Sequence, residues 1–390
     1  MKNMKAIGLA FVMFLVTVTV VKIASAYGLP GYNIKYGTWI SSTKFGCNSG
    51  MKKLLKNDNV FTVFGSSELK HCQSSGFHAD SIFKDTDITP VFIGKGGCQS
   101  LNHAITLGAV GQELSGKKVV ISISPQWFKP NGVSKNAFGS FYSETNMIAF
   151  LQNETISEKT KQYVIDRVKS LTDENPVMWN RVQDDVKWYK NNEGNMLVQA
   201  RKGIHSAIAN YKAETKLYLV SVVKGYFKKT NINGKDEISD WSMLYKKAEK
   251  KGSKISGHNP YGMYDQIYKS RYQKKVKKRI FKNLSYSVQS KEFDDLQCFL
   301  DICREENIEA LMIMQPLNGR WADDLNFPTE KRQELYDKVK ALAAKNNVQL
   351  ADLSGMEYDE YTFEDDSHLA LKGLVCFNEQ IYNFYKQNKK

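Results

Sequence analysis

The sequence predicts an α/β protein with a central parallel sheet, a helical insertion, and one transmembrane helix ahead of the domain. Three observations predict this fold. Short apolar runs of β-prone residues each stop at a loop of small or polar residues, helical stretches separate these runs, and a long middle segment has helical periodicity with few strand signals. The chain has 390 residues, 42% of them hydrophobic, which suits one α/β domain with insertions or two smaller domains and argues against disorder along its length.

The N-terminal segment predicts a membrane anchor at residues 1–27. Two lysines among residues 1–5 precede an apolar run at 6–21, which Lys22 closes. The run is slightly short for the ~20 residues that span a bilayer, but a lysine can extend its side chain to the interface, and lysines ahead of the run favour a cytoplasmic N-terminus. A cleaved signal peptide is the alternative, because the small residues that end at Ala26 fit a cleavage site. In both cases the body of the protein is exported, which argues against nucleic acid as a partner.

The runs expected to form the sheet occur in two groups, before and after the middle segment. Because each run is short, apolar and followed by a polar or glycine-rich loop, we expect parallel strands covered by helices. Ligands of such sheets bind at the carboxyl ends of the strands, where these loops lie. The predicted strands are 59–64, 90–93, 118–123, 310–314 and 348–353, and the predicted helices are 98–108, 293–303, 329–345 and 369–385.

Sequence pattern and charge divide the chain after the anchor into four parts. These are a linker and start of the domain at 28–58, the first part of the α/β domain at 59–142, a basic helical insertion at 143–290, and the second part of the α/β domain at 291–390. The net charge of +14 is local, because residues 201–290 contain 21 Lys and Arg against 6 Asp and Glu. Such a segment indicates either an anionic partner, such as membrane headgroups or a polyphosphate polymer, or a solvated helical face.

Two short motifs carry side chains suited to nucleophilic catalysis. Ser66 and Ser67 follow the first predicted strand and precede a predicted helix, whose N-terminal N–H groups can stabilise an oxyanion. Near the C-terminus, Asp365 stands three residues before His368, which places both on one side of a helical turn. Taken alone, each motif is more typical of an ordinary helix start. Because a serine is a weak nucleophile that needs such a base, the two together predict a Ser–His–Asp site.

The sequence predicts no metal and no cofactor. The remaining five histidines show no metal-ligand spacing and are expected on the surface or in the core. They are His71, His78, His103, His205 and His258. The six cysteines also follow no metal pattern. Outside the cytoplasm they could form disulfides, but small buried side chains are the default interpretation.

Several blocks of the sequence resemble a known family. Residues 64–69 resemble the first block of the SGNH/GDSL esterase superfamily, in which the catalytic serine follows the first strand, and Asp365-x-x-His368 resembles its last block. Further blocks, in the same order along the chain, resemble hallmarks of the DltD family. These blocks lie at 94–103, 123–128, 259–262, 316–321 and 366–373. The resemblance extends from the N-terminal anchor to the last predicted helix.

The resemblance implies a three-layer SGNH-hydrolase-like fold outside the membrane, and it assigns roles to individual residues. Ser67 aligns with the nucleophile, His368 with the base and Asp365 with the partner that orients the base. Gly97 corresponds to the oxyanion-hole glycine. Where the superfamily has Gly-Asp-Ser this chain has Gly-Ser-Ser, so Ser66 takes the acidic position and is the alternative nucleophile.

The oxyanion asparagine of the superfamily's third block has no clear match in this chain. Gln126, at the end of the third predicted strand, is the substitute that we predict. Asn318, in the Pro-Leu-Asn-Gly block, is a further predicted oxyanion or substrate-binding residue.

The implied function is D-alanyl transfer in the D-alanylation of lipoteichoic acid, by a serine acyltransferase that moves D-alanyl groups to poly(glycerol phosphate). The implied partners are lipoteichoic acid, a D-alanyl carrier protein or an acyl-carrying membrane partner, a membrane-bound O-acyltransferase and the cell membrane. The implied location is the cell membrane, with the catalytic domain outside. A thioesterase that hydrolyses D-alanyl carrier protein is one alternative, and a non-catalytic adaptor that presents carrier or polymer to a membrane acyltransferase is another. The sequence does not separate transfer from hydrolysis, because both begin with one acyl-enzyme.

Overall fold

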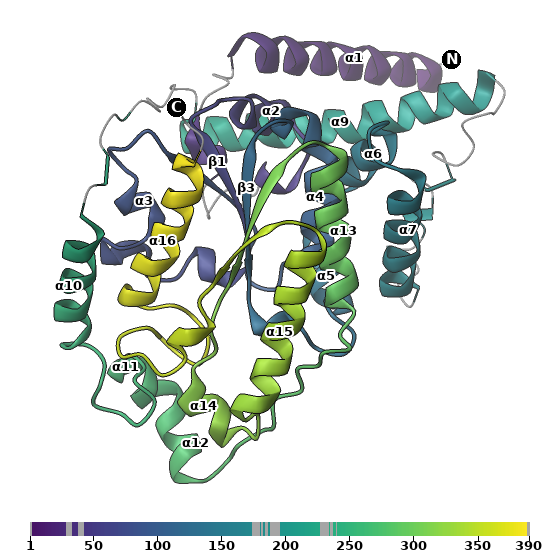
Figure 1. Cartoon of the computed structure of the whole chain (residues 1–390). Coiled ribbons are helices and arrows are strands. Elements are labelled where there is room, and N and C mark those ends of the chain that lie inside the picture. The colour runs from purple at the N-terminus through teal and green to yellow at the C-terminus, as the bar shows by residue number, and fades with distance from the viewer. Residues whose placement is uncertain are drawn as a thin grey trace.

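Five parallel strands form the central sheet of the computed structural model, in the order β2–β1–β3–β4–β5 (Figure 1). The structure describes residues 2–28, 33–37, 43–173, 180, 182–183, 186–187, 196–226, 234, 237–238 and 240–387. The strands are β1 (Val60–Phe64), β2 (Thr89–Ile93), β3 (Lys118–Ile123), β4 (Glu309–Met314) and β5 (Gln349–Asp352). The five predicted strands and the α/β class are therefore confirmed, with ends that differ by at most one residue.

The register of the sheet brings three strand ends together. β1 lies between β2 and β3, and Phe64 at its end pairs with Ile93 on one side and Ile121 on the other. All five side chains of β1 are buried, as expected for a parallel strand covered by helices on both faces. The loops that follow β1, β2 and β3 therefore lie side by side at one edge of the sheet, where a ligand would bind.

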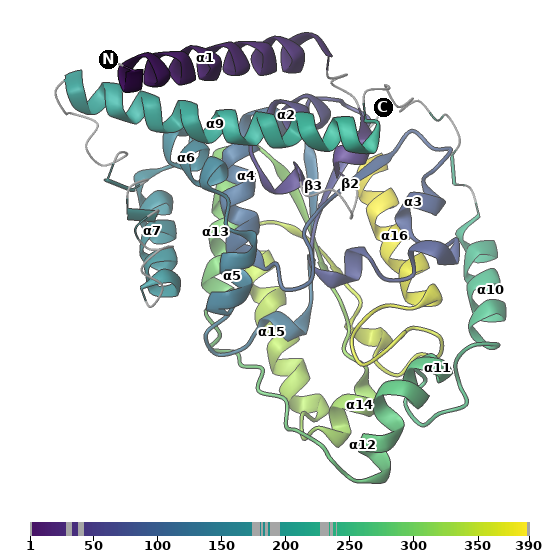
Figure 2. The same cartoon turned by 180° about the vertical axis from the view of Figure 1, so that it is seen from behind.

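Helices cover both faces of the sheet and produce three layers (Figures 1 and 2). Helices α4, α13 and α15 cover one face, and α3 and α16 cover the other. Phe64 packs on the first face, with its ring 5.3 Å from that of Phe299, and Phe61 packs on the second, 5.5 Å from Tyr385. The bounds are α3 (Ala79–Ile82), α4 (Ser100–Leu114), α13 (Glu292–Glu305), α15 (Thr329–Lys345) and α16 (Leu371–Lys386). The predicted three-layer arrangement is confirmed.

The remaining helices flank this domain. Across its described residues, the segment 143–290 contains helices and no strand, as its pattern predicts. Trp321 of α14 packs the end of this segment against the domain. Its ring lies edge-on to those of Tyr261 and Tyr272, with each pair of ring centroids 4.9 Å apart. The bounds are α2 (Ser49–Leu55), α5 (Lys135–Phe141), α6 (Glu144–Gln152), α7 (Glu158–Thr172), α9 (Met196–Lys224), α10 (Trp241–Gly252), α11 (Asp265–Ile267), α12 (Gln273–Lys277) and α14 (Gly319–Asp324).

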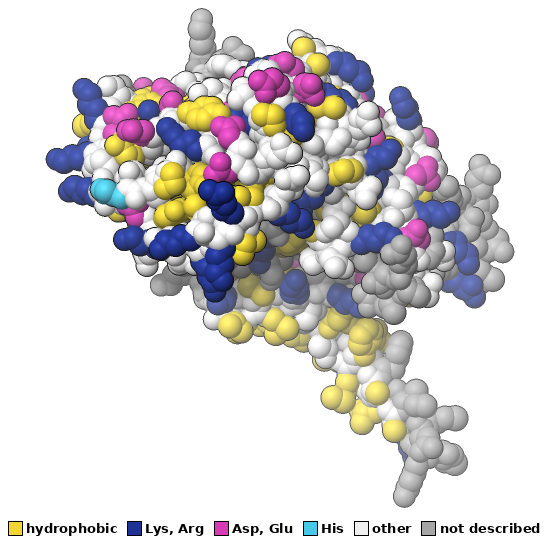
Figure 3. Space-filling view, turned by 90° about the horizontal axis from the view of Figure 1, so that it is seen from below, with side chains coloured by type: hydrophobic (Ala, Val, Ile, Leu, Met, Phe, Trp, Pro, Cys, Tyr) yellow, Lys and Arg dark blue, Asp and Glu magenta, His cyan; other side chains and the backbone are white. Residues whose placement is uncertain are grey.

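The basic residues of α12 lie on the surface at the end of the molecule away from α1. Lys274, Lys275 and Lys277 are exposed. In the view of this end, Lys and Arg side chains are interspersed with hydrophobic and neutral ones (Figure 3).

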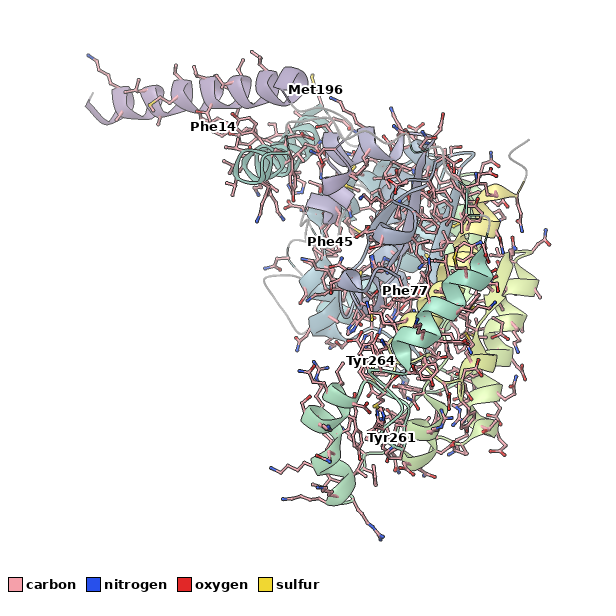
Figure 4. The ribbon with its side chains drawn as sticks, turned by 90° about the vertical axis from the view of Figure 1, so that its left-hand side faces the viewer. Phe14, Phe45, Phe77, Met196, Tyr261 and Tyr264 are labelled. Atoms are coloured by element: carbon pink, nitrogen blue, oxygen red, sulfur yellow. The ribbon has the colours of Figure 1, made fainter. Side chains whose placement is uncertain are left out.

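The N-terminal segment forms helix α1 (Lys2–Gly28), which lies alongside α9 in both views of the fold (Figures 1 and 2). Phe14 of α1 meets Tyr211 of α9 edge-on, with ring centroids 6.0 Å apart (Figure 4). Within the part of the chain that the structure describes, no helix has both the length and the apolar character that a membrane crossing requires. The predicted transmembrane helix at 1–27 is therefore not supported.

Candidate active site

The segment after β1 forms a tight turn that presents Ser67. Ser67 begins a single turn of 3₁₀ helix, Ser67–Leu69, rather than the longer helix that the sequence predicts. A side-chain Cβ at Gly65 would overlap the carboxylate of Glu68, which accepts a hydrogen bond from the backbone N–H of Ser66 at 2.7 Å. Glu68 therefore folds the turn under the serines, and Ser67 stays half-buried and accessible at the strand end.

A second loop brings an imidazole to this serine. His368 Nε2 lies 2.7 Å from Ser67 Oγ, across a separation of 301 residues. Its other ring nitrogen, Nδ1, lies 2.9 Å from both carboxylate oxygens of Asp365. The three side chains thus form a continuous chain of hydrogen bonds from hydroxyl to carboxylate, the arrangement in which a serine loses its proton to a histidine that a carboxylate orients.

The loop that carries Asp365 and His368 is not helical, which corrects the expectation of a helical turn. It is closed by an antiparallel bridge between Phe363 and Leu369, and residues 364–368 form a bend. One carboxylate oxygen of Asp365 accepts the backbone N–H of Ser367 at 3.0 Å and that of His368 at 2.8 Å. The spacing of three residues is needed here because the carboxylate caps its own loop while it holds the ring of the histidine.

The protonation states of the pair follow from its surroundings. Burial alone would raise the pKa of Asp365, but its hydrogen bond to His368 and the charge of that ring lower it to about 2. Burial alone would lower the pKa of His368, but the hydrogen bond and charge of Asp365, and then the charge of Glu68, raise it above its ordinary value. The carboxylate is therefore ionised at neutral pH, and the imidazole is made a stronger base.

Ser66, the alternative nucleophile, is held by the neighbouring loop. Its Oγ donates to the carbonyl oxygen of Lys95 at 3.2 Å and accepts the N–H of Gly97 at 2.9 Å. The side chain is buried, and His368 contacts the other serine. Ser66 therefore joins the turn after β1 to the loop after β2, while Ser67 stands opposite the base.

The glycines after β2 allow this close approach. Gly94 has φ +151°, and a Cβ there would collide with the carbonyl oxygen of Gly65. A Cβ at Gly96 would lie 3.5 Å from that of Ser67, so this loop forms one wall of the site. The N–H groups of Ser67 and Gly96 form no hydrogen bond with another described residue. The predicted oxyanion donor, Gly97, lies in the site, but its N–H is bonded to the hydroxyl beside the nucleophile.

The two predicted amide side chains occupy different positions. Gln126 lies in a short 3₁₀ turn (Pro125–Trp127) directly after β3, at the same sheet edge as the nucleophile. Asn318 is buried and caps α14, because its Oδ1 accepts the N–H of Trp321 at 3.2 Å while its Nδ2 donates to the carbonyl oxygen of Tyr261 at 2.8 Å. The structure thus assigns Asn318 a role in joining α14 to the helical segment, and both of its polar atoms are engaged.

His71 belongs to the site, although it was expected on the surface or in the core. Its ring stacks on that of His368, with centroids 3.6 Å apart and planes 10° from parallel. Its Nδ1 lies 3.1 Å from Glu364, whose carboxylate also accepts the thiol of Cys72 at 3.1 Å. His71, Asp365 and His368 place one possible metal-ligand atom each within 4.8 Å of one another. No spacing in the sequence indicates this cluster, because its members come from opposite ends of the chain.

A serine, a histidine and an aspartate thus lie in contact at one edge of a parallel α/β sheet, an arrangement whose geometry is suited to acyl chemistry at the serine. The family model described as DltD protein matches residues 37–386. The chain therefore belongs to the DltD family, within the SGNH-like superfamily.

Curated relatives cover most of the chain. It is 32% identical to Protein DltD of Bacillus subtilis (strain 168) over 346 residues, which are 86% of this chain and 85% of that protein. It is 26% identical to Protein DltD of Staphylococcus aureus (strain NCTC 8325 / PS 47), with 86% and 83% covered. It is 24% identical to Protein DltD of Lacticaseibacillus rhamnosus, with 85% and 79% covered.

Proposed function

We propose that this protein is a serine acyltransferase that moves D-alanyl groups to the poly(glycerol phosphate) chain of lipoteichoic acid, at the cell envelope. Membership of the DltD family supports a role in D-alanylation of lipoteichoic acid. The single observation that supports a catalytic role is the series of hydrogen bonds from Ser67 through His368 to Asp365. A catalytic series of this kind suits the formation of an acyl-enzyme.

In the first half of the proposed reaction, His368 Nε2 accepts the Ser67 proton while Oγ bonds to the carbonyl carbon of a D-alanyl ester or thioester. The bond from that carbon to the oxygen or sulfur of the donor breaks, and the imidazolium gives the proton to this leaving atom. The product is a D-alanyl ester of Ser67. The transient oxyanion is held by the N–H groups of Ser67 and Gly96, which form no hydrogen bond with another described residue.

In the second half, a glycerol hydroxyl of the polymer attacks the same carbonyl carbon and loses its proton to His368. Ser67 Oγ leaves and takes this proton back, which restores the enzyme. Asp365 stays ionised throughout and stabilises the imidazolium that forms in each half. Water in place of the glycerol hydroxyl would give hydrolysis from the same acyl-enzyme.

Labelling with a serine-reactive fluorophosphonate tests the nucleophile. We expect the full chain to be labelled on the peptide that contains Ser67, and the S67A variant to lose labelling. The S66A variant is the matched control, and it should keep labelling at a reduced rate because it loses only the two hydrogen bonds to the neighbouring loop. Labelling of Ser66 instead, or equal labelling of S67A, would show that the assignment is wrong.

A partition experiment tests the acceptor. The full chain is incubated with D-alanylated carrier protein, with and without poly(glycerol phosphate), and ester-linked and free D-alanine are measured. If the protein is a transferase, D-alanyl ester should appear on the polymer with the wild type and not with S67A. Free D-alanine at the same rate with and without polymer would instead indicate a thioesterase, and no turnover with intact polymer binding would indicate an adaptor.

A further inference from the structure

A cavity of about 390 Å³ lies behind the loop that follows β2. Its walls come from the segment after the first 3₁₀ turns, from the corner between α5 and α6, and from one face of α9. Phe45, on its wall, lies below α9 at the edge of the molecule (Figure 4). None of the three catalytic side chains lines this cavity, so it is a separate space beside the site.

The cavity has a positively charged lining. Lys95, Lys212 and Lys216 contribute their side chains, and among the described residues none of them forms an ion pair. The lysines on α9 are four residues apart and therefore project from the same side of the helix. The acidic residue of the lining, Glu144, lies 3.6 Å from the ring of His205, so it already has a partner. The potential within the cavity therefore favours an anion.

A fourth lysine lies next to Phe45 of the cavity wall. Lys44 is buried beside the cavity, with its Nζ 5.3 Å from the ring centroid of Phe45, and Lys95 places its own Nζ 5.7 Å from the same ring. Burial, and then the positive charge of Lys95, lower the pKa of Lys44 to about 7. An anion between the cavity walls would offset the positive charge of Lys95 that contributes to this lowering.

The lining also contains hydroxyls and an aromatic wall. Ser143 and Thr145 lie 3.1 Å apart through their hydroxyl oxygens at the start of α6. The rings of Phe45 and Phe141 lie 5.4 Å apart and form an apolar side. A chain of glycerol phosphates alternates anionic groups with short carbon segments that bear hydroxyls. Lysines, hydroxyls and a ring pair offer partners to each of these groups in turn.

The cavity shares a wall with the catalytic site. The carbonyl oxygen of Lys95 accepts the hydroxyl of Ser66, while the side chain of Lys95 lines the cavity. A Cβ at Gly97 would lie 3.8 Å from the ring of Phe141, and a Cβ at Gly96 would lie 3.5 Å from that of Ser67. The short loop between them therefore faces the nucleophile on one side and the cavity on the other.

We propose that this cavity is a phosphodiester subsite, in which Lys95, Lys212 and Lys216 hold one glycerol phosphate unit so that a neighbouring unit reaches Ser67. The subsite rests on the proposed acyl transfer, because it supplies the acceptor to the same nucleophile. In this proposal the lysines of α9 hold the substrate and those of α12 do not. Lys212 and Lys216 of α9 line the cavity, whereas α12 lies at the opposite end of the molecule (Figure 1).

The test compares two double variants of equal charge change. K212Q/K216Q removes two subsite lysines, and K274Q/K278Q removes two exposed lysines of the α12 region with the same spacing of four. The measurement is the affinity of the full chain for fluorescent poly(glycerol phosphate), by anisotropy at several salt concentrations. We expect K212Q/K216Q to bind roughly a hundredfold more weakly, about tenfold for each charge-assisted hydrogen bond to phosphate that the variant cannot form, with a smaller dependence on salt. The control pair should change the affinity less than about threefold.

The outcomes separate this subsite from the proposed function. Fluorophosphonate labelling of Ser67 should stay at the wild-type rate in K212Q/K216Q, because these lysines do not contact the triad, and thermal unfolding verifies that the variant is folded. Equal binding by wild type and K212Q/K216Q, or an equal loss in both double variants, would overturn the subsite while labelling stands. Absence of labelling in the wild type would instead contradict the acyl-transfer proposal. The binding comparison would then still show whether the cavity binds the polymer. Unchanged release of D-alanine from carrier protein without polymer places the lysines on the acceptor side; a matching loss there would contradict that placement.

Discussion

Replacing Asp365 with Asn removes one charge from the catalytic series while keeping the size of the side chain. In the structure this carboxylate contacts Nδ1 of His368 with both oxygens and also accepts two backbone N–H groups of its own loop. Its pKa falls from 3.8 to about 2. This difference corresponds to about 2.5 kcal/mol in favour of the ionised carboxylate, much of it from the imidazole.

The same interaction stabilises the imidazolium that forms when Ser67 loses its proton. Loss of about 2.5 kcal/mol of this stabilisation slows acylation roughly 70-fold. An asparagine can also present its amide N–H to the imidazole and favour the wrong tautomer, which raises the expected loss to about 10³- to 10⁴-fold. The D365N variant should therefore label with fluorophosphonate at least about 70-fold more slowly than the wild type.

The dependence on pH gives a second readout with a defined sign. The reaction needs neutral His368, so the labelling rate rises as pH passes the pKa of this imidazole. In the wild type that pKa is raised, chiefly by the hydrogen bond and charge of Asp365 acting against burial. Without the carboxylate charge the pKa falls, so the rise in rate should move to lower pH in D365N.

The assay is the rate of labelling of Ser67 between about pH 5 and pH 9, with thermal unfolding as a control for folding. A D365N variant that labels at the wild-type rate, or whose rise in rate stays at the same pH, would refute the view that this carboxylate orients and charges the base.

Three further predictions concern the surroundings of the site. G94A should lower the free energy of unfolding in urea by at least about 3 kcal/mol, because a Cβ at this position, where φ is +151°, collides with a backbone carbonyl. The control G116A, where φ is +73° and the space is open, should lower it by only about 1 kcal/mol. Equal losses in the two variants would contradict this account. H71A should slow fluorophosphonate labelling of Ser67 roughly tenfold, because the imidazole of His368 loses a ring stacked 3.6 Å away. H71F should recover most of the rate, because it restores a flat ring. If H71F does not recover the rate, stacking is not the contribution of His71. R332M should lower the free energy of unfolding by about 3 to 5 kcal/mol, because it leaves the buried carboxylate of Glu357 without its cation. The double variant R332M/E357Q should regain part of this loss, because it no longer buries an unpaired charge. Calorimetry measures both changes.

Much of the fold could be predicted from the sequence because it depends on local pattern. An apolar β-prone run that stops at glycine or serine indicates a buried parallel strand whichever partners it has, so all five strands were placed to within one residue. The residue types and the local spacing indicate Ser67, which directly follows the first strand, and the pair Asp365 and His368, a carboxylate three residues before a base. A serine needs such a base, which is why the sequence predicts that the three residues meet.

Local pattern was less informative about the backbone around these residues. The spacing of Asp365 and His368 fits a helical turn, but the chain forms a closed bend instead, because the carboxylate accepts the amides of its own loop. The helix expected after Ser67 is one 3₁₀ turn, because Glu68 turns back to bond Ser66. The apolar run at 6–21 predicted a membrane crossing that the described helices do not support.

What the sequence by itself determined is the set of strands, the order of the polar loops and the three side chains that meet at the candidate site, because periodicity and residue type are written along the chain. Only the tertiary structure determined which loops lie next to one another around the site and the cavity. In it His71 stacks on His368, Asn318 caps helix α14, and two lysines of α9 lie behind the loop that faces Ser67. The stacked rings and the lysine-lined wall join segments that are far apart in the sequence, so they depend on how helices pack on the sheet, and no short stretch of sequence carries that information.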